Sequence, residues 1–322
     1  MTRLLPLITL PLLLAACATT APVNDAGTLY HYQLKAPQGN DLTLEQALAR
    51  VADADIVLVG ELHTHPAVHL LQARMLAGLA ADGRPLVLSM EQFSRADQPV
   101  LDAYLAGRIG EAALIRDGNA WPNYQSDYRP LVEFAKAHHL PVIAANAPKP
   151  LVSCVGQEGP AWLDQLPASR RSQLARTLTL GDDPYRQKFM ASLHHGDADS
   201  NARRFAAQTS WDDTMAESMV DYLRSNPGQR IMHIAGNFHV EGGLGLASRI
   251  ASRNPDLKVA LVVPELTAPQ AGEGQAAASR IADVRVGIAP LPERWLNADE
   301  MKQDMGALHQ SRSRDCSQWL QP

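Results

Sequence analysis

Apolar residues along this chain alternate between short continuous runs and longer helical repeats. The clearest case lies between Ile56 and Leu79. Ile56–Val59 is an unbroken apolar run, which is typical of a strand buried on both faces. Gly60 ends this run, and Pro66 suits the first turn of a helix, because its missing N–H needs no partner there. Strand, polar turn and helix in this order predict one unit of a parallel α/β sheet.

The same alternation continues along most of the chain. Further strands are predicted at residues 85–91, 141–145, 230–235, 259–263 and 284–288, and helices at residues 42–51, 99–106, 107–119, 130–139 and 242–253. Residues 149–226 differ, because they carry helical patterns, at residues 149–156, 169–178, 185–195 and 201–224, and no strand pattern. The predicted fold class is therefore α/β: a mainly parallel sheet flanked by helices, with an inserted all-helical lid at about residues 149–226.

Polar residues stand where the predicted strands end. These residues are Glu61, His63, Glu91, Asn146 and His239. Ligands of parallel sheets bind outside the carboxyl ends of the strands, so this set is a candidate site. Two imidazoles and a carboxylate also form the ligand set of many divalent metal sites, which makes His63, Glu91 and His239 candidate metal ligands. The alternative is a hydrogen-bonded polar cluster that closes the sheet edge without a metal.

A helix in the insertion carries a second candidate site. Tyr185 and Lys188 are three residues apart and lie on neighbouring parts of one helical face. A flat, largely apolar cofactor with two carboxylates suits such a helix, and tyrosinate is a known axial ligand of haem iron. The alternative is a surface helix with ordinary polar residues.

The N-terminus carries a targeting pattern. Arg3 precedes the apolar run Leu4–Leu14, which is too short to span a bilayer. The run ends in Leu14-Ala15-Ala16-Cys17, which resembles a bacterial lipoprotein signal. The resemblance implies cleavage before Cys17 and lipidation of that residue, and Ala18 after it favours the outer membrane. The alternative is an ordinary secretory signal with a chance cysteine.

The interpretation as a lipoprotein divides the chain into a signal peptide at residues 1–16, a tether at residues 17–41 and a main domain at residues 42–322. In an oxidising compartment the remaining cysteines, Cys154 and Cys316, can form one disulfide that staples the C-terminus to the body. The alternative is two unpaired thiols. The formal charge of −5 argues against a nucleic-acid partner.

Several motifs occur in order along the chain: Gly60-Glu61-Leu62-His63, Met90-Glu91-Gln92-Phe93, Trp121 with Tyr128-Arg129-Pro130-Leu131, Ile143-Ala144-Ala145-Asn146-Ala147-Pro148, Trp211-Asp212-Asp213-Thr214-Met215-Ala216 and Ile234-Ala235-Gly236-Asn237-Phe238-His239-Val240. Together they resemble the ChaN-type haem-binding lipoproteins of the Tiki-like superfamily. The resemblance covers residues 42–265 and agrees with the lipoprotein signal.

The resemblance implies a role in haem and iron uptake or storage, with two stacked haems at a dimer interface. In this family a tyrosine of one subunit ligates each iron, and a histidine and a lysine of the other subunit hold the propionates. Carried over to this chain, these residues are Tyr185, Lys188 and either His194 or His195, because that helix offers all three residue types.

A second tyrosine is the alternative haem ligand. Tyr128 is followed by Lys136 and by His138 and His139, which again supplies the three residue types. Its place in a packed helix beside a strand favours a structural role for Tyr128.

The same superfamily includes metal-dependent hydrolases that use a Gly-x-x-His pattern and a glutamate. Because this chain keeps His63, Glu91 and His239, a metal-dependent hydrolase or protease is the alternative function. The interpretation favoured here is a haem-binding protein rather than an enzyme, lipid-anchored to the outer membrane and facing the periplasm. Its expected partners are haem, a second copy of the chain when haem is bound, the membrane and an outer-membrane haem receptor.

Overall fold

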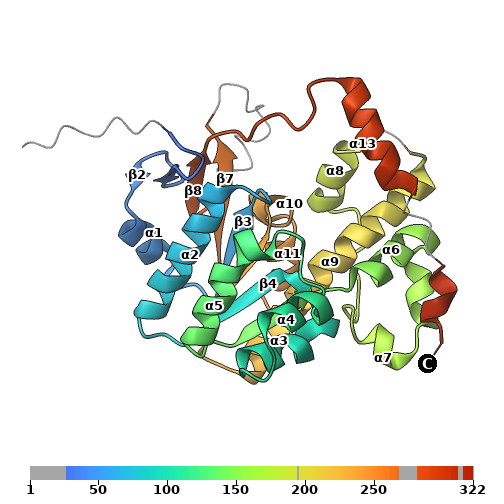
Figure 1. The fold of residues 1–322 in the computed structure, drawn as a ribbon, viewed down its shortest axis with the longest axis horizontal. Helices are drawn as coiled ribbons and strands as arrows, with labels where there is room; N and C mark the ends of the chain where they lie inside the picture. Colours follow the sequence, from blue (N-terminus) through green and yellow to red (C-terminus); the bar gives the residue numbers. More distant parts are fainter. Residues whose placement is uncertain (1–26, 194–195, 268–280, 311–314, 322) are drawn as a thin grey trace, which may run out of the picture.

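The computed structural model describes residues 27–193, 196–267, 281–310 and 315–321. Its centre is an eight-stranded sheet with the order β2-β1-β8-β7-β3-β6-β4-β5 (Figure 1). Strand β1 pairs antiparallel with β2 and with β8, and the other neighbours are parallel. The strands are β1 (Tyr32–Lys35), β2 (Asp41–Leu42), β3 (Ile56–Glu61), β4 (Leu86–Ser94), β5 (Val142–Asn146), β6 (Arg230–Gly236), β7 (Val259–Leu266) and β8 (Val284–Ile288).

Helices connect most of these strands, as the parallel arrangement requires. The α-helices are α1 (Leu44–Val51), α2 (Pro66–Ala81), α3 (Gln98–Leu105), α4 (Glu111–Asp117), α5 (Arg129–Ala137), α6 (Lys149–Glu158), α7 (Ala168–Arg171), α8 (Pro184–Ala191), α9 (Ala198–Ser225), α10 (Asn237–Val240), α11 (Leu246–Arg253) and α13 (Ala298–Gln310). Short 3-10 or π turns include η1 (Arg95–Asp97), η2 (Tyr124–Tyr128), η3 (Pro160–Gln165), η4 (Glu241–Gly243) and η5 (Cys316–Trp319). The predicted α/β class is confirmed.

Strand β3 shows how the core is built on both sides of the sheet. Val57 and Val59 point into a cluster formed with α1, α2 and α5. Ile56 and Leu58 point the other way, into a cluster formed with α9 and α11. This arrangement explains the unbroken apolar run, because alternate side chains of a doubly covered strand are all buried.

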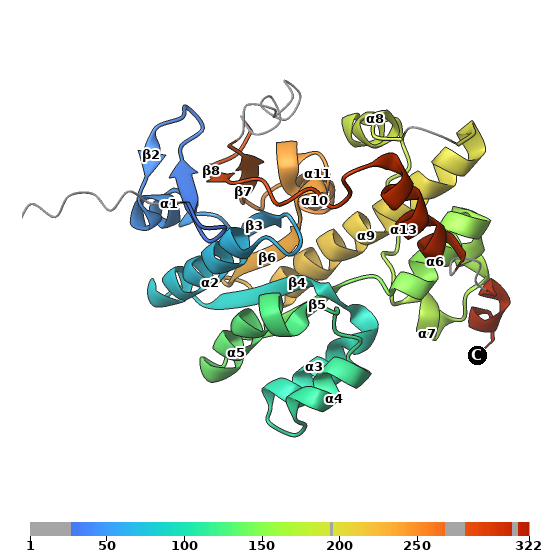
Figure 2. The ribbon, with the colours of Figure 1, turned by 45° about the horizontal axis from the view of Figure 1, so that its top comes forward.

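The described residues of the insertion at 149–226 form helices and turns without strands, as expected, and build a third apolar cluster beside the sheet (Figure 2). The expectation of a lid alone was incomplete. The C-terminal half of α9 packs directly on the sheet through Met215, Met219 and Leu223, so it also forms a structural layer. The predicted helix at 169–178 is shorter, because α7 covers only Ala168–Arg171.

The N-terminal part of the chain differs from the expected tether at residues 17–41. Tyr32–Lys35 forms the sheet strand β1, with Leu34 buried against the core. One buried residue in a polar segment gives too weak an alternation to predict a strand. Cys17 and the signal segment lie outside the described residues. No helix among the described residues is long and apolar enough to cross a membrane.

Candidate functional site

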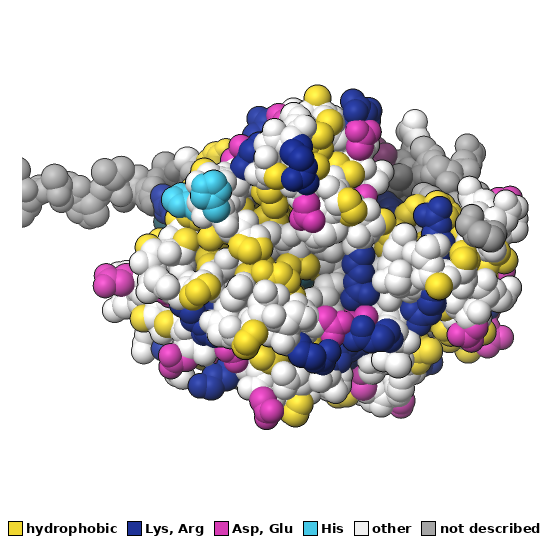
Figure 3. Space-filling model, turned by 90° about the horizontal axis from the view of Figure 1, so that it is seen from below, with side chains coloured by type: hydrophobic (Ala, Val, Ile, Leu, Met, Phe, Trp, Pro, Cys, Tyr) yellow, Lys and Arg dark blue, Asp and Glu magenta, His cyan; other side chains and the backbone are white. Residues whose placement is uncertain are grey.

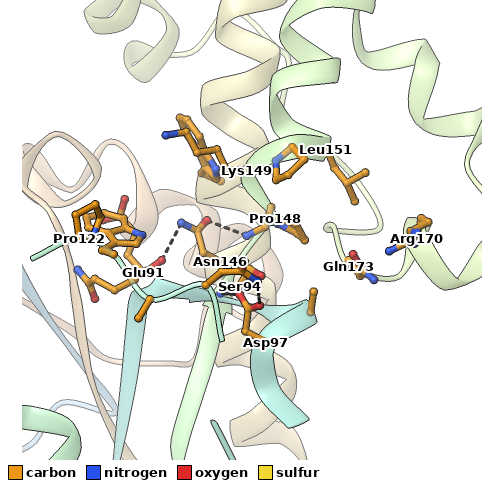
Figure 4. A pocket seen from close by; sticks show the side chains of 18 of the residues that line it. Glu91, Ser94, Asp97, Pro122, Asn146, Pro148, Lys149, Leu151, Arg170 and Gln173 are labelled. Atoms are coloured by element: carbon orange, nitrogen blue, oxygen red, sulfur yellow. Dashed lines mark hydrogen bonds between the residues drawn. The ribbon is translucent and has the colours of Figure 1, made fainter. Parts of the chain in front are cut away.

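A cavity of about 900 Å³ lies at the carboxyl ends of the strands, between the sheet and the helical insertion. Figure 4 shows Glu91 and Pro122 on one side of it and Arg170 and Gln173 on the other. Figure 3 shows Lys and Arg side chains beside the hollow of one face of the molecule. The cavity is lined by His63, Glu91, Gln92, Ser94, Ala96, Asp97, Asn119, Ala120, Trp121, Pro122, Asn146, Ala147, Pro148, Lys149, Pro150, Leu151, Arg170, Gln173, Trp211, His239 and Trp319.

Two glycines let the strand ends approach closely enough to form this site. A Cβ on Gly60 would lie 2.5 Å from Oδ1 of Asn237, and a Cβ on Gly236 would lie 3.1 Å from Nε2 of His63. The first distance is a clash and the second is very tight, so these positions favour glycine. They bring the turn after β3 against the turn after β6, and so place His63 near His239.

His63 is oriented by a buried carboxylate. Its Nδ1 lies 2.7 Å from Oε1 of Glu61, and its side chain is 46% exposed whereas that of Glu61 is fully buried. Glu61 also accepts hydrogen bonds from Gln72, Gln92 and the hydroxyl of Tyr128. Burial raises the pKa of Glu61, but the His63 hydrogen bond and nearby imidazole charges outweigh burial and lower it. An ionised Glu61 therefore keeps a proton on Nδ1 of His63 and leaves Nε2 as the ring nitrogen that Glu61 does not engage.

The pKa of His63 itself is raised above its ordinary value. Burial lowers this pKa, but the hydrogen bond to Glu61 and the charges of Glu61 and Glu91 act in the opposite direction and prevail. The His63–Glu61 pair therefore holds a proton tightly. Any ligand that binds Nε2 of His63 must compete with protonation of the imidazole at low pH.

His239 belongs to a second imidazole–carboxylate pair. Its Nδ1 donates to Oδ1 of Asp212 at 2.8 Å, and the other oxygen of Asp212 accepts from the Tyr185 hydroxyl at 2.7 Å. Burial lowers the pKa of His239, but the charges of Asp212 and Glu91 outweigh burial and raise it to about 9. His239 is thus protonated at neutral pH and presents a positive charge to the cavity.

Glu91 lies between the two histidines. Its Oε2 accepts from the backbone N–H of Gly236 at 2.6 Å, and its Oε1 lies 3.6 Å from Nε2 of His239. Asn146 donates to the Glu91 carbonyl at 3.0 Å, which fixes the end of β5 against β4. The structure thus brings His63, Glu91, Asn146 and His239 to one cavity.

The expected divalent metal site finds no support in this geometry. Within the described ranges, no group of three or more His, Cys, Asp or Glu side chains is arranged to hold a metal ion. The physical reason is that His239, whose pKa is raised to about 9, carries a proton on both ring nitrogens at neutral pH, and that one carboxylate oxygen of Glu91 already accepts from the Gly236 N–H.

The two tyrosines predicted as haem ligands are both buried in the protein. The Tyr185 side chain is 1% exposed and its hydroxyl bonds Asp212; burial, followed by the Asp212 charge, raises its pKa well above the ordinary value. Tyr128 is fully buried and its hydroxyl donates to Glu61 at 2.6 Å. In this conformation neither phenol oxygen can reach a haem iron, and both tyrosines instead position the carboxylates behind the cavity histidines.

The predicted propionate clamp Lys188 does not line the cavity either. Lys188 forms an ion pair with Glu241 at 2.8 Å and donates to the carbonyl of Phe238. His194 and His195 lie outside the described residues. The alternative set around Tyr128 is separated too, since Lys136 packs over the ring of Tyr104 and His138 stacks on Phe134.

Several cavity residues had no assigned role in the sequence. Lys149 begins α6, Arg170 lies on α7, and Trp319 lies in η5 near the C-terminus. Trp121 and Asp212 belong to the ordered family motifs, so the sequence marked these segments without assigning the two residues a role. For Trp319 the signal was indirect: it follows Cys316, whose disulfide with Cys154 is present in the structure.

Comparison with known proteins gives one family match. The model of the family described as haem-binding uptake, Tiki superfamily, ChaN matches residues 47–250. No curated protein matches the chain.

Solved structures share the fold. The structure described as cofacial haem binding to ChaN of Campylobacter jejuni has a TM-score of 0.61 and 14% identity, and the match covers 80% of this chain and 97% of that one. A Bacillus cereus protein has a TM-score of 0.46 and 11% identity, covering 80% and 95% of the two chains. An erythromycin esterase mutant has a TM-score of 0.45 and 13% identity, covering 85% and 87%.

Proposed function

The chain belongs to the ChaN family of haem-binding uptake proteins in the Tiki superfamily, and on that basis we propose that it binds haem in the cavity at the strand ends. The role would be to take up or store haem at the bacterial cell envelope.

The lining of the cavity is the observation that carries the proposal. Its volume of about 900 Å³ lies within the range of ordinary cofactor sites. Trp121, Trp211 and Trp319 supply apolar aromatic surface for a flat macrocycle. Lys149 and Arg170 supply positive charges for the two acid groups of haem. The residues present therefore fit an amphipathic, dianionic, planar ligand.

His63 is the residue that we propose as the iron ligand. Haem iron takes an axial ligand from the protein, and histidine is a common one. An imidazole whose Nδ1–H donates to a carboxylate is fixed in orientation and made more basic, as in many metal sites. His63 has this arrangement with Glu61, its Nε2 is not engaged by that carboxylate, and the residue lines the cavity. His239 is less suited, because its side chain is only 9% exposed, against 46% for His63, and because its pKa is raised to about 9.

Tyrosine ligation would need a different conformation. For Tyr185 to bind iron, its hydrogen bond to Asp212 must break and the buried ring must leave its contacts with Phe205 and Phe238. The side chain of Tyr128 would likewise have to leave Glu61. We therefore assign both tyrosines a positioning role.

We further propose that haem-bound copies pair and that the protein is anchored by lipid on Cys17 to the outer membrane. Pairing is suggested by the Campylobacter jejuni relative, whose haem binding is described as cofacial. The sequence Leu14-Ala15-Ala16-Cys17 supports the anchor. An outer-membrane haem receptor would be the natural donor.

A titration of ferric haem, followed by absorbance and molar mass, tests the proposal. We expect a saturable Soret shift with one haem per chain and a doubling of the molar mass on saturation. Binding without saturation would contradict a specific site. Saturable binding without the change in molar mass would contradict the proposed pairing and still support the haem site.

A hydrolase is the second candidate function, favoured by the Asp212–His239 pair and by Glu91 facing one cavity. Because His239 is protonated at neutral pH, it would act as a general acid and Glu91 as a base. Hydrolysis of chromogenic esters or peptides by the purified protein, lost in His239→Ala and independent of added divalent metal, would support this function.

A further inference from the structure

The C-terminal segment supplies one wall of the cavity. Trp319 lies in η5 and lines the cavity together with Arg170, whose guanidinium lies 5.2 Å from the centre of the indole ring. Figures 1 and 2 both show this segment beside α6 and α7. A residue close to the end of the sequence thus reaches the same cavity as His63 near its beginning.

The contacts of η5 show what holds Trp319 in place. Among the described residues, the hydrogen bonds of its polar side chains are local: Ser317 and Gln318 donate to Asp315, the residue just before η5. The indole N–H of Trp319 is buried and has no hydrogen-bond partner among the described residues. Among the described residues, the segment is attached to the body by apolar packing, by the Arg170 contact and by the disulfide from Cys316 to Cys154 of α6.

The disulfide is the strongest of these attachments. It joins residues 162 positions apart, and Cys316 is buried only three positions before Trp319 on the same turn. Fixing Cys316 therefore fixes the backbone that carries the indole. The segment also lies beyond residues 47–250, the part of the chain that the family model matches.

We propose that Trp319 is a ligand-contact residue and that the Cys154–Cys316 disulfide is the device that positions it, so that reduction of this bond weakens ligand binding. The inference rests on the proposed haem site and names a redox control of that site. A dithiol reductant gives up two electrons and two protons: the Cys154–Cys316 bond breaks, two cysteine thiols form, and the dithiol becomes a disulfide. Among the attachments described above, Trp319 then keeps its apolar packing and the Arg170 contact.

The test is a set of ferric haem titrations with folded protein. Trp319→Ala should weaken binding about tenfold, through loss of aromatic contact. The Cys154→Ala/Cys316→Ala variant should weaken it by a similar or smaller factor. Because the disulfide acts through Trp319, the triple variant that combines all three substitutions should bind haem no more weakly than Trp319→Ala alone. Trp295→Ala is the matched control, since Trp295 contacts Arg294 and Asp304 and does not line the cavity.

A second measurement keeps the test decisive if the cysteine variant folds poorly. Wild-type protein is reduced, alkylated and freed of reductant before the titration, and near-ultraviolet circular dichroism checks its fold. By thermodynamic linkage, bound haem should also make the disulfide of untreated protein harder to reduce at equilibrium, so that its reduction potential falls.

Unchanged affinity in Trp319→Ala, unchanged affinity in the folded reduced protein, or losses that add in the triple variant would overturn the inference while leaving the haem site intact. Failure of the wild-type protein to bind haem would instead overturn the proposed function itself.

Discussion

The hydroxyl of Tyr185 donates a hydrogen bond of 2.7 Å to Asp212, the residue that also holds His239. A tyrosine that the sequence offers as an iron ligand thus lies behind a cavity histidine. Gln208 donates to the same hydroxyl at 3.0 Å, so the oxygen has partners as both donor and acceptor. This environment stabilises the neutral phenol and not the phenolate that an iron centre needs.

The first prediction concerns Tyr185→Phe. We expect the absorption spectrum of the ferric haem complex to stay the same, because the hydroxyl binds Asp212 and not the cavity. The fold should be destabilised by about 1 kcal/mol, since Asp212 loses a buried hydrogen bond. Visible spectra and urea denaturation measure the two effects. Loss of a tyrosinate charge-transfer band in this variant would show that Tyr185 ligates the iron after a rearrangement.

The second prediction concerns pH and His239. Its pKa in the folded protein, about 9, lies above the ordinary value of 6.5. The protonated form therefore stabilises the fold: this contribution is complete below pH 6.5 and is lost as the pH rises through about 9. The loss is up to about 3 kcal/mol. His63, with a raised pKa, acts in the same direction.

Urea denaturation at several pH values between 6 and 10 measures this dependence. Asp212→Asn is the informative variant, because it removes the charge that raises the His239 pKa. Its free energy of unfolding should be lower than that of the wild type at pH 6 and should change less between pH 6.5 and 9. Parallel curves for the two proteins would show that His239 does not titrate in this range.

The sequence predicted those parts of the structure whose signals lie in neighbouring residues, and it missed those that depend on contacts between distant residues. The strand at Ile56 and its polar turn could be predicted, because a buried parallel strand reads as one apolar run. The meeting of His63, Glu91 and His239 followed from a rule about strand ends. Tyr185 could not be placed, because helical spacing tells which residues share a face and not which face is buried. Trp319 could not be placed either, because its partners are far away in sequence.

The third prediction concerns the membrane anchor. Cys17→Ala should release the protein from the membrane fraction, because a chain without lipid has only weak affinity for a bilayer. Fractionation of cells producing the variant and the wild type measures the distribution. Ser94→Ala, far from the signal, is the control and should remain with the membranes. A Cys17→Ala protein that still sediments with membranes would refute lipid anchoring at this residue.

The central claim is that the strand-end cavity holds haem through Nε2 of His63. The most direct measurement is the spectrum and affinity of ferric haem bound to His63→Ala, with His138→Ala, a histidine outside the cavity, as control. We predict that His63→Ala loses the wild-type Soret position and at least tenfold in affinity, that added imidazole restores the spectrum, and that His138→Ala behaves as the wild type. A wild-type spectrum and affinity in His63→Ala would contradict the account.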